Sequence, residues 1–111
     1  MEVSEVIIGA VKVLKPRGPL VAADADNFKR AALEASRSNL GRIVLDASAL
    51  PYADSRGLEV LAELADELSG SGLTLKLCET NETMREVLDL TELSGLFEYY
   101  EDANTAVRSF L

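Results

Sequence analysis

The sequence predicts a single α/β domain, residues 1–111, in which a mixed sheet of four to five strands with an N-terminal hairpin is combined with about four helices. Three observations predict this class. Two short apolar runs flank Gly9-Ala10 near the start. After them, strand-like runs alternate with segments of helical periodicity, the pattern of α/β domains. The length suffices for one core, and no linker or repeat divides the chain.

The chain begins with strand-forming segments. Residues 5–8 and 11–14 are apolar and β-branched, which predicts either a hairpin or a bulged strand. Pro16-Arg17-Gly18-Pro19 then breaks the pattern and predicts a turn. The two segments therefore open the sheet before any helix forms.

A first helix and a buried strand follow. The spacing of apolar residues predicts a helix over about 25–38, with Asp24 or Asp26 as its N-cap. Residues 43–47 are apolar up to Asp46 and predict an interior strand, and residues 48–54 form a loop.

The second half continues the alternation of helices and strands. The expected elements are a helix over about 56–69, a strand over 73–78, a helix over 82–90 capped by Asn81 or Thr80, a strand over 96–100 and a helix over 102–110. Ser69-Gly70-Ser71-Gly72 ends the first of these helices. Strands separated by helices in this way predict parallel pairing after the hairpin.

Composition and charge exclude several classes of function. The net charge is −8, which argues against nucleic acid as a partner because such binding neutralises phosphates. No apolar run approaches the length of a bilayer span, so we expect no membrane insertion. The acidic N-terminus lacks the features of a signal peptide. The single cysteine, Cys78, fits a reducing cytoplasm and is expected to be a small core residue.

Enzymatic chemistry is poorly supported by the sequence. The chain has no histidine, which removes Ser-His-Asp and Cys-His arrangements and every metal site that needs histidine. No glycine-rich phosphate loop or dinucleotide fingerprint is present. We therefore expect no catalytic residue, no metal and no cofactor.

The segment Asp54-Ser55-Arg56-Gly57-Leu58 is the main functional candidate, since it joins the buried strand to the second helix. A phosphate on Ser55 would lie near free N–H groups of the helix, with the positive charge of Arg56 adjacent. Gly57 would leave a partner free to approach the hydroxyl. The simpler interpretation is purely structural: Ser55 or Asp54 is an N-cap and Gly57 serves close packing.

Charge and aromatic residues around this segment also leave two interpretations open. Residues 59–111 carry three basic and twelve acidic side chains. Four of the acids recur at helical spacing after Ser55, namely Glu59, Glu63, Asp66 and Glu67. They form either a solvated helix face or a docking surface for a basic partner. Tyr52 either anchors the loop by packing or contacts a partner.

Three blocks of the sequence resemble the STAS family, and within it the bacterial anti-sigma factor antagonists. The first block is residues 43–46 followed by Leu50-Pro51-Tyr52-Ala53-Asp54-Ser55-Arg56-Gly57-Leu58, similar to the family's strand, loop and phospho-acceptor serine. The second is residues 72–77, and the third is residues 84–107. The chain departs from the family at Arg56, where a small residue is usual, and at residues 18–21, which replace Gly-Glu-Leu-Asp.

The resemblance implies a non-enzymatic switch. An unphosphorylated chain would bind a serine-kinase anti-sigma factor, phosphorylation of Ser55 would end the binding, and a PP2C-type phosphatase would restore it. The implied partner contacts are Tyr52, Asp54, Arg56, Gly57, Leu58 and Glu59. Asp24 is added to them because it follows within one turn of residues 18–21, where the chain departs from the family pattern.

Two other functions stay open at this stage. The chain could be a STAS scaffold subunit of a transporter or of a stress-signalling assembly, without phosphorylation. It could also be a carrier of a small ligand in an apolar cavity.

Overall fold

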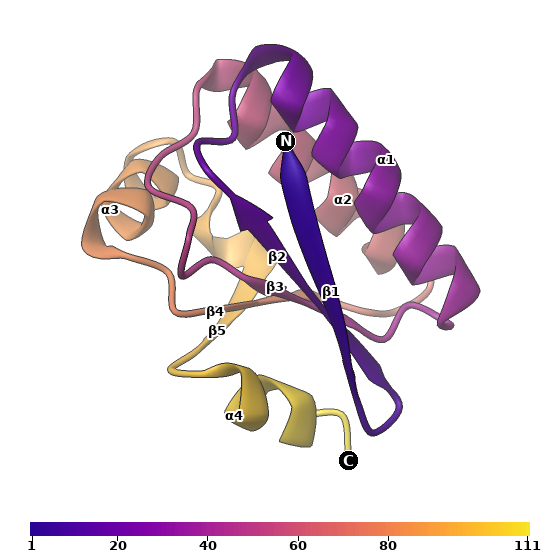
Figure 1. Cartoon of the computed structure of the whole chain (residues 1–111). Helices are drawn as coiled ribbons and strands as arrows, with labels where there is room; N and C mark the ends of the chain where they lie inside the picture. Colours follow the sequence, from indigo (N-terminus) through magenta and orange to yellow (C-terminus); the bar gives the residue numbers. More distant parts are fainter.

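The structure is a computed structural model that describes all 111 residues, and its centre is a five-stranded sheet in the order β1-β2-β3-β4-β5 (Figure 1). The antiparallel hairpin is formed by β1 (Glu2–Ile8) and β2 (Val11–Arg17). The strands β3 (Ile43–Asp46), β4 (Leu75–Cys78) and β5 (Phe97–Tyr100) then add in parallel. The predicted mixed sheet with an N-terminal hairpin is confirmed.

The hairpin is longer than the sequence pattern predicted. Pro16 and Arg17, expected in a turn, continue β2 and pair with Val3 and Glu2 of β1. Pro16 lies past Leu14, the last residue of β2 that pairs with β3. A proline is tolerated there because a strand paired on one side only needs fewer N–H donors.

Four helices pack on the two faces of this sheet. Figure 1 shows α1 (Ala22–Ser38) and α2 (Ser55–Ser69) side by side on one face and α4 (Ala103–Arg108) on the other. The remaining helix, α3 (Glu82–Leu90), follows β4, and a 3₁₀ turn (Ser94–Leu96) leads into β5. Of the two predicted caps of α3, Asn81 is the correct one, since its Oδ1 accepts the Met84 N–H at 2.7 Å.

Several predicted element boundaries were wrong. The first helix begins at Ala22 rather than about residue 25, and neither Asp24 nor Asp26 is its N-cap; that position is Val21, which makes no side-chain cap. The fourth strand begins at Leu75 rather than Leu73, and α4 spans only Ala103–Arg108. Propensity alone places element ends poorly because tertiary contacts fix the terminal turns.

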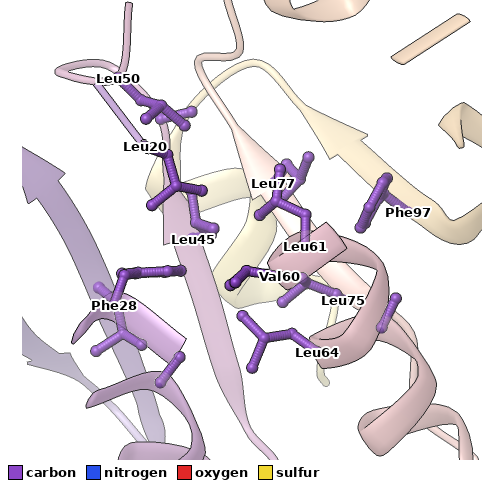
Figure 2. Packing of buried hydrophobic residues seen from close by; sticks show 14 of the residues in the cluster. Leu20, Phe28, Leu45, Leu50, Val60, Leu61, Leu64, Leu75, Leu77 and Phe97 are labelled. Atoms are coloured by element: carbon purple, nitrogen blue, oxygen red, sulfur yellow. The ribbon is translucent and has the colours of Figure 1, made fainter. Parts of the chain in front are cut away.

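The main core lies between the sheet and α1 and α2. It is a cluster of 20 buried residues to which both helices, β3, β4 and β5 contribute (Figure 2). Phe28 of α1 and Leu64 of α2 are each only 1% exposed to solvent. They lie over the inward side chains of β3 and β4, of which Figure 2 labels Leu45, Leu75 and Leu77.

The opposite face carries a smaller cluster of five buried residues beneath α4: Val11, Val13, Val44, Cys78 and Ala106. Cys78 is fully buried, which confirms its prediction as a core residue. Burial raises the pKa of its thiol to about 12, so the reactive thiolate is suppressed.

None of the helices combines the length and the apolar character that a bilayer crossing requires.

Candidate functional site

Ser55 is the first residue of α2 and lies at the carboxyl edge of the parallel strands. Its side chain is exposed, and its hydroxyl makes no hydrogen bond to the rest of the protein. The N-cap of α2 is instead Asp54, whose Oδ1 accepts the Gly57 N–H at 2.8 Å. Of the two candidate N-caps, Ser55 and Asp54, it is therefore Asp54 that caps α2, and the Ser55 hydroxyl is free.

Asp54 also holds the start of α1. Its second oxygen, Oδ2, accepts the Ala22 N–H at 3.0 Å. One carboxylate therefore satisfies a terminal N–H of each of two helices, groups that have no partner within their own helix. The first N–H of α1 thus finds its acceptor on a residue 32 positions away, a contact that no local sequence pattern could predict.

The loop before Ser55 is fixed by neighbours on two sides. On one side it runs parallel to the segment before α1, where the Leu20 N–H donates to Tyr52 O at 2.9 Å and the Asp54 N–H to Leu20 O at 3.2 Å. On the other side, Asn81 Nδ2 donates to the carbonyls of Leu50 and Pro51, both at 3.2 Å. Such bonds give Ser55 a defined position.

Gly57 is buried against this second segment. A Cβ at position 57 would overlap the carbonyl oxygen of Leu20 and press on the Cβ of Ala53. Of the two interpretations of Gly57, close packing is what the structure shows. The glycine permits the close parallel contact of the two loops.

Arg56 takes part in an ion-pair network that joins α1 and α2. Its Nη2 donates to Asp26 Oδ1 at 2.6 Å, and its Nη1 donates to Glu63 Oε1 at 2.6 Å and to Glu59 Oε2 at 3.0 Å. Lys29 of α1 completes the network by donating to Glu63 Oε2 at 2.7 Å. Three carboxylates thus occupy the guanidinium, which therefore is not a free cation beside Ser55.

The ion-pair network shifts the pKa values of its members. Hydrogen bonds from Arg56 hold the pKa of Asp26 below its usual value. Hydrogen bonds from Lys29 and Arg56 lower the pKa of Glu63 in the same way. The same carboxylates raise the pKa of Arg56. Each group is stabilised in its charged form by a partner of opposite charge.

Three of the four acidic residues of α2 form ion pairs with cations of α1 or of α2 itself. Glu59 and Glu63 contact Arg56, and Glu67 accepts from Arg37 of α1 at 3.2 Å, whereas Asp66 has no ion-pair partner. The sequence could not show the pairs with Lys29 and Arg37 because these cations come from α1, whereas Arg56 belongs to α2 itself. Pairing leaves less net negative charge for a basic partner than the α2 sequence suggested.

The other expected contact residues differ in how exposed they are to solvent. Tyr52 is 53% exposed, so its expected role as a packed anchor of the loop is not what the structure shows. Glu59 is exposed, whereas Leu58 is half-buried and packs on the main core. Asp24 lies in the first turn of α1 and accepts the N-terminal ammonium of Met1 at 3.1 Å.

Sequence reasoning missed the contribution of the segment before α1. Ala22 and Ala23 are exposed at the start of α1, next to the loop that carries Tyr52 and Ser55. The sequence does carry a signal, since residues 18–21 correspond in position to a family loop, but no sequence pattern predicts that this segment pairs with residues 52–54. Together, Ala22, Ala23, Pro51, Tyr52, Ser55 and Glu59 are the exposed residues of the candidate interaction surface.

Comparison with known proteins agrees with this fold. The family model described as STAS domain matches residues 2–106. No curated protein matches the sequence. Among solved structures, a candidate anti-sigma factor antagonist from Thermotoga maritima is 26% identical over 96% of this chain and 92% of its own, with a TM-score of 0.87.

Two further structures share the fold at lower identity. The Bacillus cell fate determinant SpoIIAA in its phosphorylated form is 17% identical over 97% of this chain and 99% of its own, with a TM-score of 0.71. The murine anion transporter Slc26a9 is 17% identical over 93% of this chain but only 18% of its own, with a TM-score of 0.73. The family match over nearly the whole chain, on the fold described above, shows that the protein belongs to the STAS domain family.

Proposed function

We propose that this chain is a phosphorylation-regulated interaction switch of the anti-sigma factor antagonist type and acts without catalysis in the cytoplasm. In its unphosphorylated form it binds a serine-kinase anti-sigma factor through the candidate interaction surface. Phosphorylation of Ser55 by that kinase ends the binding, and a PP2C-type phosphatase restores it.

The observation that carries the proposal is the state of the Ser55 side chain. Its hydroxyl is exposed and free of hydrogen bonds, while the neighbouring Asp54 takes over the capping of α2. A kinase can therefore modify this oxygen without breaking a contact on which the fold depends. The added group, with a charge of roughly −1.5 to −2, would be tolerated at the N-terminus of a 15-residue helix.

The surroundings of Ser55 make the phosphate effective against a partner. The nearest cation in sequence, Arg56, is already held by three carboxylates. Its charge therefore does not neutralise a phosphate, and the new charge faces the partner. A doubly charged group at the centre of a packed interface opposes binding through desolvation and repulsion.

The surface itself fits a protein partner. Tyr52, Ala22 and Ala23 give it small apolar patches, and Tyr52 is an aromatic residue of the kind that is enriched in interfaces. The hydrogen bonds from the segment before α1 and from Asn81 hold the surface rigid before binding. A preformed surface lowers the entropy cost of association.

The proposal is tested in the native host with tagged wild-type protein and with Ser55→Ala and Ser55→Asp variants. Intact-mass spectrometry and fragment mapping of the wild-type protein should find one phosphoryl group on Ser55. Wild type and Ser55→Ala should co-purify with a kinase-fold protein, and ATP should release it from wild type only. Ser55→Asp should not retain that protein.

The matched control is Ser71→Asp, which adds the same charge in the exposed turn at the far end of α2. It should bind as wild type does. An unmodified mass under all growth conditions, or a partner that Ser55→Asp retains and that ATP does not release, would reject the switch. The latter result would establish the scaffold function instead.

A further inference from the structure

A cavity of about 350 Å³ lies at the end of the molecule opposite Ser55. It is bounded by the β1–β2 turn, by the residue that precedes β3, and by the end of α4 with the residues that follow it. In Figure 1 the β1–β2 turn and the C-terminus lie near each other at this end of the sheet. The lining is mostly apolar, with walls formed by Ile8, Val11, Val107 and Phe110.

Two arginines supply the charged side chains of this cavity, and no aspartate or glutamate side chain lines it. Arg42 and Arg108 form no salt bridge anywhere in the structure, although the chain carries a net charge of −8 and most other cations are paired. The Nε atom of Arg42 is buried and has no hydrogen-bond partner. A buried guanidinium N–H without an acceptor is costly, so an acceptor from outside the chain would be favoured there.

We propose that this cavity binds a small anionic amphiphile, with its carboxylate or phosphate head on Arg42 and Arg108 and its hydrocarbon chain on the apolar walls. Guanidinium groups are the preferred partners of carboxylate and phosphate oxygens, because their N–H groups match the geometry of both. The volume lies at the lower end of the range typical of ligand pockets and suits one short chain.

The shape of the cavity favours this occupant over a second copy of the protein. A copy of this acidic chain could bring a carboxylate to the arginines, but the cavity is a concave space and not a flat face. An amphiphile meets both requirements at once, since it supplies an acceptor for Arg42 Nε and covers Ile8 and Phe110. Because the site lies at the amino ends of β2 and β3, it does not depend on the function proposed for Ser55.

The test is an NMR titration of the ¹⁵N-labelled full chain with decanoate, decyl phosphate and the uncharged 1-decanol. Both anions should cause saturable shifts confined to residues 8–11, 42 and 107–110. Decanol should bind at least about tenfold more weakly, because it makes no charge-assisted hydrogen bond. Comparing the two anions identifies whether a carboxylate or a phosphate head is preferred.

Variants at the arginines separate specific binding from simple partition of hydrocarbon. Arg42→Gln and Arg108→Gln should each weaken decanoate binding by about tenfold or more. Arg30→Gln, which removes the same charge from an exposed position on α1, should leave it unchanged. Arg108 is exposed, so its variant stays informative even where Arg42→Gln impairs folding.

Three results would overturn the proposal. These are an absence of saturable shifts at the cavity, binding of decanol as tight as that of decanoate, and concentration-dependent shifts of the same residues without amphiphile. The last would identify a second copy as the occupant.

Discussion

The two faces of the sheet differ in how completely they are covered. On one face, α1 and α2 bury a cluster of 20 residues and are tied together by the Arg56 network. On the other, the six-residue α4 covers a cluster of only five residues and leaves the apolar cavity beside it. The face covered by α1 and α2 (the thick face) supports the candidate interaction surface. The face covered by α4 (the thin face) leaves room for a ligand.

The charged residues differ between the faces in the same way. On the face covered by α1 and α2, the cations Lys29, Arg37 and Arg56 each pair with a carboxylate of α2. On the thin face Lys76 pairs with Glu98 at 2.8 Å, but Arg42 and Arg108 meet none. Paired charges support packing, while unpaired charges beside an apolar cavity are typical of a binding site.

The two faces should differ most in the stability that is lost when a core side chain is truncated. Leu64→Ala, in the large cluster, should lower the free energy of unfolding by about 2–5 kcal/mol. Val13→Ala, in the small cluster, should lower the free energy of unfolding by only about 1–2 kcal/mol. The substitution removes fewer carbon atoms, and it removes them from a less enclosed site. Urea unfolding measures both, and equal losses would contradict the comparison.

The helix caps should show the same asymmetry on a smaller scale. Asp54→Ala removes acceptors from Gly57 and from Ala22, so it should cost about 2 kcal/mol. Asp102→Ala removes one acceptor, that of the Thr105 N–H in α4, and should cost about 1 kcal/mol. Thermal unfolding of the two variants checks the difference, and an equal effect would mean that the Ala22 contact contributes nothing.

The smallest effect concerns the dependence of stability on pH. Asp26 and Glu63 have folded-state pKa values below their usual 3.8 and 4.5, so their stabilising contribution is present above those values. It is lost as the pH falls through the lowered values of the folded state. Arg56→Gln should therefore flatten the fall in unfolding free energy below about pH 4.5.

Arg30→Gln is the control for this measurement, since Arg30 donates to Asn27 and forms no ion pair. Urea unfolding at a series of pH values should show the slope of wild type in this variant. The same flattening in both variants would indicate a general effect of net charge and not of the network.

Much of the fold could be predicted from the sequence because its signals are local. The alternation of apolar runs and helical periodicity predicted the order of all the strands and helices, and the predicted bounds of α3 match the structure. The Ser55 segment was also placed correctly between a buried strand and a helix. Periodicity reports which side of an element faces the core, and this requires no knowledge of what packs against it.

The geometry of the candidate site could be predicted only in part. The sequence pointed to Asp54, Ser55, Arg56 and Gly57, but their roles depend on residues far away in the chain. Gly57 is required because the Leu20 carbonyl lies against it, and one of the carboxylates that Arg56 binds belongs to Asp26 of α1, 30 positions away. No local pattern encodes such pairs.

The sequence by itself thus determined the fold class, the order of elements and the position of Ser55 at the start of α2. Tertiary structure alone decided that Asp54 joins two helix ends, that Tyr52 is exposed, and that Arg42 and Arg108 meet at an apolar cavity. The physical reason is range. Backbone preference and periodicity act over a few residues, whereas capping across helices, burial and charge pairing arise only when distant segments are packed together.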